Sequence, residues 1–180
     1  MPIYYTLIAN KVDNVLCEYT DKEGNFQQIS RMLLAKAVDK DTNQALVYSN
    51  HKFHAINDKG VTYLCLSDNM DDKIIISFLK DVQLNLNRQY DSDYILAAPA
   101  YKLSAFEKQI KELVEYYETS PRKSVTGNMI NELNETKSLV VKNISTLLDR
   151  ENTLELTIKN SERLKDSSIK VLNYVRLFYL

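Results

Sequence analysis

The stretch ALVYSNHKFHAINDKGVTYLCL, residues 45–66, decides the fold of the first part of this chain. It contains three short runs rich in β-branched, aromatic and other apolar residues, which are Ala45–Ser49, Lys52–Ile56 and Val61–Leu66. Such runs favour strands. The last two are joined by Asn57–Gly60, whose Asn, Asp and Gly content is typical of a tight turn. Sequential strands linked by short turns predict an antiparallel sheet.

Two further strands and three helices surround this stretch. Ile3–Ala9 and Asn14–Tyr19 are β-rich runs on either side of a polar turn, which predicts a hairpin. Apolar residues at spacings of three and four indicate helices after Gly24, after Asn69 and over about Leu103–Tyr117. The order is then β-β-α-β-β-β-α-α. We therefore expect an α+β domain with a five-stranded antiparallel sheet and three helices.

The composition is that of an ordinary globular chain and excludes several classes of partner. Its 180 residues carry 23 basic and 24 acidic side chains, for a net charge of −1. This near-neutrality gives no electrostatic reason to expect nucleic acid or an anionic membrane surface as the main partner. Cys17 and Cys65 are too few for a disulfide framework, so a reducing compartment such as the cytosol is expected. No run approaches the roughly 20 apolar residues of a membrane span, and no signal peptide is recognisable.

The character of the sequence changes near Pro121. The polar residues 119–124 predict a linker. Beyond Pro121 the chain has a single glycine, Gly127, and no proline, which favours one long helix. We therefore predict a domain over residues 1–118, a linker over 119–124 and a helical segment over 125–180.

The helical segment contains a seam at heptad spacing. Alternating steps of three and four through Arg150 meet only apolar, small or uncharged polar residues. A seam sustained over the whole segment predicts a coiled-coil helix that needs partner helices, because one helix cannot bury its own stripe. Besides Arg150, the seam residues are Thr126, Met129, Leu133, Thr136, Val140, Asn143, Leu147, Leu154, Thr157, Ser161, Leu164, Ser168, Val171, Val175 and Phe178.

Arg150 is a permanent cation on the seam between Leu147 and Leu154. Burying it without a partner would cost several kcal/mol. Its planar guanidinium, which only donates hydrogen bonds, suits side-chain carbonyls that converge from neighbouring helices. A buried polar layer of this kind fixes register and helix number. The other interpretation is that Arg150 lies at the border of the seam and reaches solvent along its own long side chain.

Both parts of the chain resemble one known family. Residues 142–156, KNISTLLDRENTLEL, resemble the central SNARE motif of the R-SNAREs, and residues 161–168 continue it in register. Residues 1–118 resemble a longin domain. The longin matches are clearest at residues 24–26, 46–49, 53–54 and 61–66. Because the two parts follow each other in the family's order, the chain is similar to longin-type vesicle-associated membrane proteins.

The resemblance implies a fold, a function and partners. It implies a profilin-like longin domain followed by a SNARE helix, with Arg150 as the zero-layer residue that meets three glutamines of partner Q-SNAREs. The seam residues become layers of a four-helix bundle that zips from near Met129 toward Phe178 and drives membrane fusion. It also implies that the longin domain restrains the SNARE motif and acts in sorting, with Leu46 and Tyr48 on the strand that contacts the folded-back motif or an adaptor. The implied location is the cytosolic face of transport vesicles and of endosomal, lysosomal or vacuolar and plasma membranes.

A second apolar strip beside the seam independently favours folding back. It comprises Val141, Ile144 and Leu148, and continues with Leu156, Ile158, Ile169 and Leu172. A helix of a four-helix bundle needs only its narrow seam, so the additional apolar surface suggests a second binding state. We hypothesise that this strip docks on the longin domain. The alternative is that a wider apolar face is merely compatible with bundle packing.

The sequence departs from the family in two respects. Thr136 and Thr157 occupy layers where aliphatic residues are more usual, which weakens or tunes pairing. The family's C-terminal transmembrane helix has no counterpart, because residues 173–180 are too few to span a bilayer. The last four residues lack a cysteine for prenylation, and Met1-Pro2 cannot be myristoylated. We therefore expect either a cytosolic fragment of an anchored protein or an unanchored, inhibitory SNARE.

Other candidate sites carry little information. His51 and His54 are the two histidines of the chain and have no third ligand nearby, so no metal site is expected. There is no Gly-rich phosphate loop, metalloprotease motif or nucleophile elbow, so neither an enzyme nor a cofactor is expected. The alternative from a different functional class is a longin-type trafficking adaptor whose C-terminal helix assembles without driving fusion. The seam centred on Arg150 speaks against it.

Overall fold

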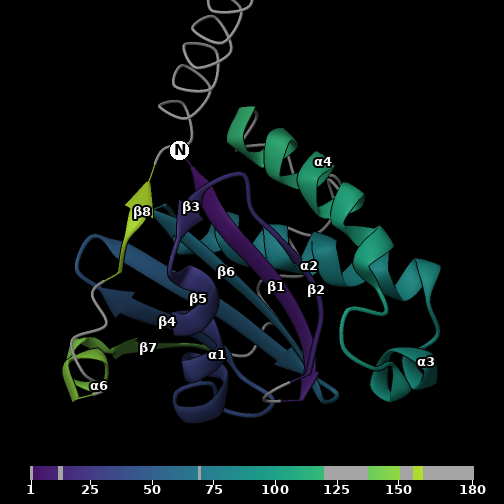
Figure 1. Ribbon diagram of the computed structural model, residues 1–180, viewed down its shortest axis with the longest axis horizontal. Helices are drawn as coiled ribbons and strands as arrows, with labels where there is room; N and C mark the ends of the chain where they lie inside the picture. Colours follow the sequence, from purple (N-terminus) through teal and green to yellow (C-terminus); the bar gives the residue numbers. More distant parts are fainter. Residues whose placement is uncertain (1, 12–13, 69, 120–137, 151–155, 160–180) are drawn as a thin grey trace, which may run out of the picture.

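The centre of the molecule is a six-stranded sheet with the strand order β2-β1-β6-β5-β4-β7 (Figure 1). The computed structural model describes residues 2–11, 14–68, 70–119, 138–150 and 156–159, with only the backbone of residues 149, 150 and 159. The strands of this sheet are β1 (Ile3–Lys11), β2 (Asn14–Tyr19), β4 (Asn43–Tyr48), β5 (His51–Asp58), β6 (Val61–Asp68) and β7 (Leu139–Asn143). A separate two-stranded sheet pairs β3 (Glu23–Gly24) with β8 (Ile158–Lys159).

The sheet differs from the prediction in strand number and direction. All five predicted strands are present, but β7 adds a sixth. It runs parallel to β4, whereas the other neighbouring pairs are antiparallel. The predicted five-stranded antiparallel sheet was therefore wrong in both respects. The physical reason lies at the edge of β4, whose backbone N–H and C=O groups need hydrogen-bond partners. Residues 139–143 can provide them, because the β-branched Val140 and Val141 favour a strand.

Helices cover both faces of this sheet. They are α1 (Phe26–Lys36), α2 (Asp72–Gln89), α3 (Ser92–Ala97), the 3-10 turn η1 (Ser104–Phe106), α4 (Glu107–Thr119) and α6 (Ser145–Arg150). The α1 helix lies on one face, and α2 and α4 lie on the other (Figure 1). The three predicted helices correspond to α1, α2 and η1 with α4. The short α3 was not predicted, because it buries a single side chain, Ile95, and has no apolar periodicity.

Local sequence explains where two of these elements begin or turn. Asp71 caps α2, because its side chain accepts a hydrogen bond from the backbone N–H of Lys73 at 2.9 Å. The β5–β6 hairpin turns at Lys59 and Gly60, whose φ angles are +49° and +82°. This is the conformation that two-residue hairpins favour, and glycine adopts it without steric cost.

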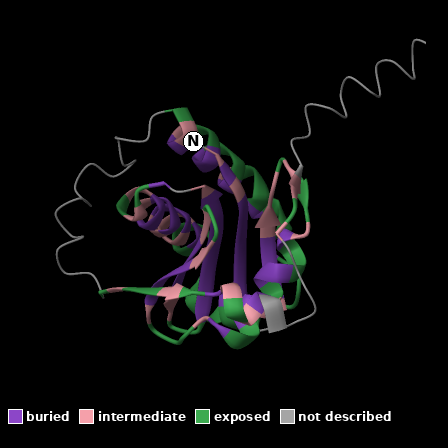
Figure 2. Ribbon diagram, turned by 90° about the vertical axis from the view of Figure 1, so that its left-hand side faces the viewer, coloured by how far each residue is buried: buried purple, intermediate pink, exposed green. Residues whose placement is uncertain are grey.

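The sheet separates two hydrophobic clusters, and Figure 2 shows that buried residues line the strands between them. The first cluster fills the space between the sheet and the helices α2 and α4. The second, here called the α1-side cluster, includes Phe26, Leu33, Leu46 and Phe53. Two residues of the C-terminal part, Ile144 and Leu148, belong to the α1-side cluster. The C-terminal part therefore contributes to the core of the domain that precedes it.

The predicted division of the chain falls at the end of α4. This helix ends at Thr119, and residues 120–124 of the predicted linker lie outside the described residues. The predicted continuous helix over residues 125–180 was wrong at Leu139–Asn143 and Ile158–Lys159, which are strands, whereas Ser145–Arg150 is helical. A lone seam helix has little to bury, whereas β4 and β3 offer backbone partners. Among the described residues, no helix has the length and apolarity that a bilayer crossing requires.

Candidate functional site

The described C-terminal residues, 138–150 and 156–159, form a docked segment on the edge of the sheet. β7 lies alongside β4 in a parallel register that pairs Val47 with Asn143. The backbone N–H of Ile144 continues this pairing by donating to the carbonyl oxygen of Val47 at 3.0 Å. The docked segment thereby covers the backbone groups of an edge strand, which in many proteins are the binding site for an added strand.

Two side chains of the docked segment enter the core. Ile144 and Leu148 are only 3% and 1% exposed and lie in the same cluster as Leu46. The Oδ1 of Asn143 accepts a hydrogen bond from the N–H of Ser145 at 2.9 Å, which begins α6. The turn of α6 then brings Leu148 onto the same side as Ile144. Burial of each side chain stabilises the docked segment by about 1.5 to 3 kcal/mol.

The docking strip predicted from helical spacing is only partly buried. Ile144 and Leu148 lie in the core, whereas Val141 is 61% exposed. Val141 pairs with Ala45, and adjacent residues of a strand point to opposite faces, so Val141 faces away from Leu46. The strip assumed a helix, but residues 139–143 are a strand, and this explains the different position of Val141.

An ion pair joins the docked segment to the loop after α1. The Nζ of Lys142 lies 2.6 Å from the carboxylate of Asp39 and 3.4 Å from the carbonyl oxygen of Ala37. The Nε2 of Gln44 donates to the same two acceptors, at 3.1 Å and 3.3 Å respectively. Because the Lys142 and Asp39 side chains are 36% and 54% exposed, this pair adds at most about 1 kcal/mol.

The surface implied for the folded-back motif lies beneath the docked segment. Leu46 is fully buried, and Tyr48 is half-buried and packs against the α1-side cluster. Both belong to β4, the strand that β7 covers.

The seam residues that the structure describes are spread over different elements. Val140 and Asn143 are exposed members of β7, Leu147 is half-buried in α6, Arg150 ends α6, and Thr157 is exposed just before β8. The other seam residues, Thr126, Met129, Leu133, Thr136, Leu154, Ser161, Leu164, Ser168, Val171, Val175 and Phe178, lie outside the described residues. Residues 139–143 cannot be a strand and part of a coiled-coil helix at once. This conformation and a bundle through Val140 therefore exclude each other.

The docked segment makes a second contact, whose strand pairing was not predicted although Leu156 and Ile158 belong to the predicted apolar strip. β8 pairs with β3, so that Gly24 lies opposite Ile158. Leu156 and Ile158 pack against the α1-side cluster. The apolar strip selected these two side chains, but a two-residue strand has no periodicity, so the pairing with β3 could not be located.

The two histidines each face an aspartate, which sequence reasoning also missed. His54 is buried, and its Nε2 lies 2.9 Å from the carboxylate of Asp72, which also accepts from Lys52 at 2.8 Å. Burial lowers the pKa of His54 below 6.5. Partial burial raises the pKa of Asp72, but the bonds from Lys52 and His54 outweigh it and lower that pKa overall. His51 lies 3.5 Å from Asp68.

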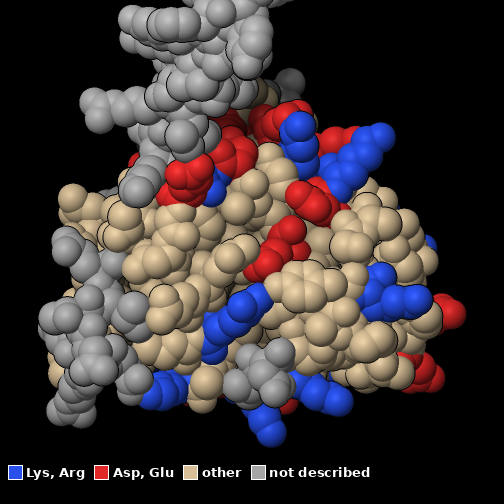
Figure 3. Space-filling model, in the orientation of Figure 1, with Lys and Arg blue, Asp and Glu red and all other residues tan. Residues whose placement is uncertain are grey.

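The described part of the chain contains no candidate metal centre, and the face drawn in Figure 3 has no basic stripe. The His, Cys, Asp and Glu residues of this part of the chain form no group of three that could hold a metal ion. On the face drawn in Figure 3, basic and acidic side chains are interspersed around a broad uncharged area. The most developed candidate site is therefore the contact between the docked segment, β4 and α1.

Comparisons with known proteins identify what this arrangement is similar to. Residues 16–110 match the family model described as Longin: Regulated-SNARE-like domain. The chain is 31% identical over 173 residues to vesicle-associated membrane protein 7B of Dictyostelium discoideum, an alignment that covers 94% of this chain and 66% of the relative. It is 25% identical over 172 residues to vesicle-associated membrane protein 714 of Arabidopsis thaliana, covering 93% and 77% respectively. Identity to vesicle-associated membrane protein 7 of Gallus gallus is 25% over 170 residues, covering 94% and 77%.

Proposed function

Because this chain belongs to the longin-domain family of vesicle-associated membrane proteins, we propose that it is an R-SNARE of vesicle-mediated transport. Its SNARE motif, centred on Arg150, pairs with three Q-SNARE helices in a four-helix bundle that drives membrane fusion. The longin domain, residues 1–118, holds part of that motif in a closed form and takes part in sorting. The partners act at the cytosolic face of vesicles and of endosomal, lysosomal or vacuolar and plasma membranes.

The observation that carries this proposal is the position of the docked segment. Val140, Asn143 and Leu147 belong to the uncharged seam around Arg150, and all three lie in the segment that covers β4. The same residues thus have two possible sets of partners, the longin domain or foreign helices. A segment with two exclusive partners is suited to regulated assembly, because any ligand that prefers one form shifts the population toward it.

In the bundle, the seam supplies the free energy and Arg150 supplies the register. Each large apolar layer residue removed from water contributes about 1.5 to 3 kcal/mol. The guanidinium of Arg150 donates to side-chain carbonyls of three partner glutamines, so its charge is not left without acceptors. Before the bundle can form through this region, residues 139–143 have to leave β4 and change from strand to helix. The contacts of Ile144 and Leu148 in the core oppose that step.

Assembly with purified Q-SNARE helices tests the proposal. Mixing the full chain with three such helices should produce a gain in helicity by circular dichroism and a heat-resistant complex. Arg150→Glu places a carboxylate among glutamine oxygens and should weaken assembly by the order of 100-fold or more. Lys165→Glu, a charge reversal beside the seam, is the matched control and should leave assembly within about twofold. A trafficking adaptor would show no gain in helicity, and equal assembly by the Arg150→Glu protein would contradict the proposal.

A further inference from the structure

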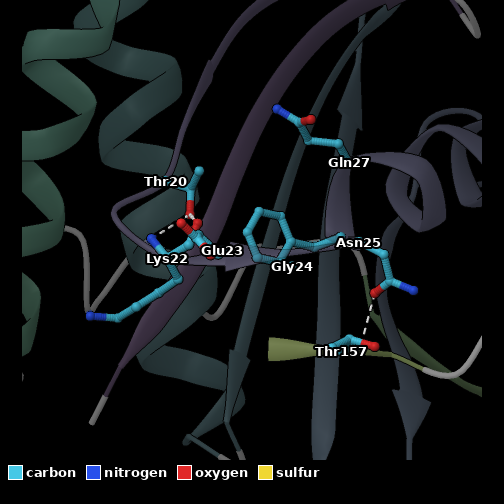
Figure 4. A pocket seen from close by; sticks show the side chains of 8 residues that line it. Thr20, Lys22, Glu23, Gly24, Asn25, Gln27 and Thr157 are labelled. Atoms are coloured by element: carbon cyan, nitrogen blue, oxygen red, sulfur yellow. Dashed lines mark hydrogen bonds between the residues drawn. The ribbon is translucent and has the colours of Figure 1, made fainter. Parts of the chain in front are cut away.

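The contact of β3 with β8 is chemically separate from the contact of β7 with β4. Asn25 and Thr157 exchange two hydrogen bonds, because the Asn25 N–H donates to the Thr157 carbonyl at 3.3 Å and the Thr157 N–H donates to the Asn25 Oδ1 at 2.8 Å (Figure 4). Gly24 pairs with Ile158 directly beside them. The backbone partners of this contact thus come from β3 and the start of α1, whereas the backbone partners of β7 come from β4.

The side chain of Asn25 binds Thr157 and does not cap helix α1. Asn25 is the N-cap residue of α1, and its carbonyl oxygen accepts from the N–H of Ile29 at 3.2 Å. Its side chain makes no cap hydrogen bond, and its φ of −97° and ψ of 17° differ from the extended conformation of most N-cap residues. The first turn of α1 also has no acidic residue that could replace the cap. An Asn25 side chain released from Thr157 can rotate to cap the N–H groups of Gln27 or Gln28.

Gly24 provides the space that Thr157 occupies. A Cβ atom added at Gly24 would lie 2.2 Å from the Thr157 carbonyl oxygen and 2.6 Å from the Phe26 ring. The ring can move by rotation about its side-chain bonds, but the carbonyl belongs to the backbone of the contact itself. Any larger residue at position 24 is thus incompatible with the docked position of Thr157.

This contact is the weaker of the two that hold the docked segment. It consists of a two-residue strand, the exposed Thr157 and the half-buried Leu156 and Ile158, and an open pocket of about 550 Å³ lies beside it. The other contact has a five-residue strand and the buried side chains of Ile144 and Leu148. Short pairings open to solvent are the ones that unfold locally at the lowest free energy.

We infer that Gly24, Asn25 and residues 156–159 form a second clamp that opens before β7 leaves β4, and that Asn25 then caps α1 in place of binding Thr157. The result is a half-open form in which residues 156–159 are accessible while Val140 and Asn143 remain on β4. The use of this form in bundle assembly rests on the proposed function, but the order of opening does not. The new cap hydrogen bond of Asn25 offsets part of the free energy that is lost when the clamp opens, so the clamp can open and close reversibly.

Hydrogen exchange of the full chain without any partner tests this order. In the Gly24→Ala protein, amides of residues 156–159 should exchange at least about tenfold faster, the loss expected for hydrogen bonds of this strength. Amides of residues 139–143 should change by less than about twofold. The amides of Gln27 and Gln28 should become better protected, because Asn25 now caps them.

Asn25→Ala is the matched variant. It should free residues 156–159 in the same way, but without the gain in protection at Gln27 and Gln28, because alanine has no acceptor. Two outcomes overturn the inference: unchanged exchange at 156–159 in the Asn25→Ala protein, or equal acceleration at 139–143 and 156–159, which would mean a single cooperative contact. Since no SNARE helix is present in this experiment, a failure of bundle assembly leaves its result unaffected.

Discussion

The central sheet and the docked segment share one core but are attached to it very differently. Strands β1, β2, β4, β5 and β6 pair with one another antiparallel, and their inward side chains, such as Phe53 and Leu64, are fully buried. The docked segment is attached through the five-residue parallel strand β7, the two-residue strand β8, the buried side chains of Ile144 and Leu148, the half-buried Leu156 and Ile158, and polar contacts. The contacts among β1, β2, β4, β5 and β6 stabilise the fold itself. The contacts of the docked segment are fewer, so this segment can detach by local unfolding while the rest of the fold remains.

The largest effect is expected from a change in the core that both regions share. Phe53 lies opposite Leu46 in the sheet and is fully buried, so Phe53→Ala should lower the free energy of unfolding by about 3 to 5 kcal/mol. Urea unfolding followed by circular dichroism measures this loss. Exchange should accelerate in β5 and β7 alike, and acceleration confined to β7 would contradict a shared core.

The double change Ile144→Ser with Leu148→Ser should separate the two regions. It removes about 3 to 6 kcal/mol of burial from the docked segment and changes no residue of β1 to β6, although both side chains pack in the α1-side cluster. Limited proteolysis should then cut within residues 138–150 much faster, while β1 to β6 remain protected. Val141→Ser is the control, because Val141 is 61% exposed and should have no such effect. Unchanged cleavage in the double variant would show that burial of these side chains does not hold the segment.

A smaller effect is expected from acid, and it arises at the contact between His54 of β5 and Asp72 of α2. His54 has a lowered pKa in the folded chain, whereas in the unfolded chain it takes up a proton near its ordinary pKa of about 6.5. The unfolded state therefore binds more protons below about pH 6.5, and stability falls as the pH decreases. The lowered pKa of Asp72 acts in the same direction, but only near and below 3.8.

His54→Gln removes the titrating group that causes the first part of this acid effect. The melting temperature of the His54→Gln protein should be nearly constant between about pH 7 and 5, whereas that of the unchanged protein should fall. An equal fall in both proteins would mean that another group is responsible.

The smallest effect is expected from the ion pair of Lys142 with Asp39. Lys142→Gln should increase exchange of the β7 amides by at most about fivefold, since the pair is largely exposed. The difference between the two proteins should shrink at high salt. Lys111→Gln removes a lysine that pairs with Glu115 on α4 and serves as the control. A loss of docking as large as that of the Ile144 and Leu148 double variant would contradict the predominance of apolar burial.

The contrast between the two regions also explains how much of the fold the sequence could predict. Alternating and apolar runs located five of the six strands of the central sheet, β1, β2, β4, β5 and β6, because their side chains are buried in one fixed arrangement. Residues 139–143 were assigned to a helix. Their seam pattern fits packing against partner helices, which this structure does not contain. The β-branched Val140 and Val141 fit a strand equally well.

For the candidate site, the sequence identified which side chains take part better than it identified their secondary structure and contacts. Ile144, Leu148 and Leu46 were selected from an apolar strip and from a family resemblance, and the structure brings all three into one cluster. Asp39, Asn25 and Gly24 could not be selected, because a distant ion pair and a reciprocal backbone contact leave no periodic signal. The role of Arg150 as zero-layer residue stays a prediction.

A reversible disulfide between β4 and β7 tests the central claim most directly, namely that residues 139–148 have to leave β4 before the seam can pair. Val47 and Asn143 are Cα partners at the accessible end of this pairing, and the native Cys17 and Cys65 are buried. The account predicts that the oxidised Val47→Cys, Asn143→Cys protein does not assemble with Q-SNARE helices and that reduction restores assembly. Equally fast assembly in the oxidised and reduced forms would contradict it.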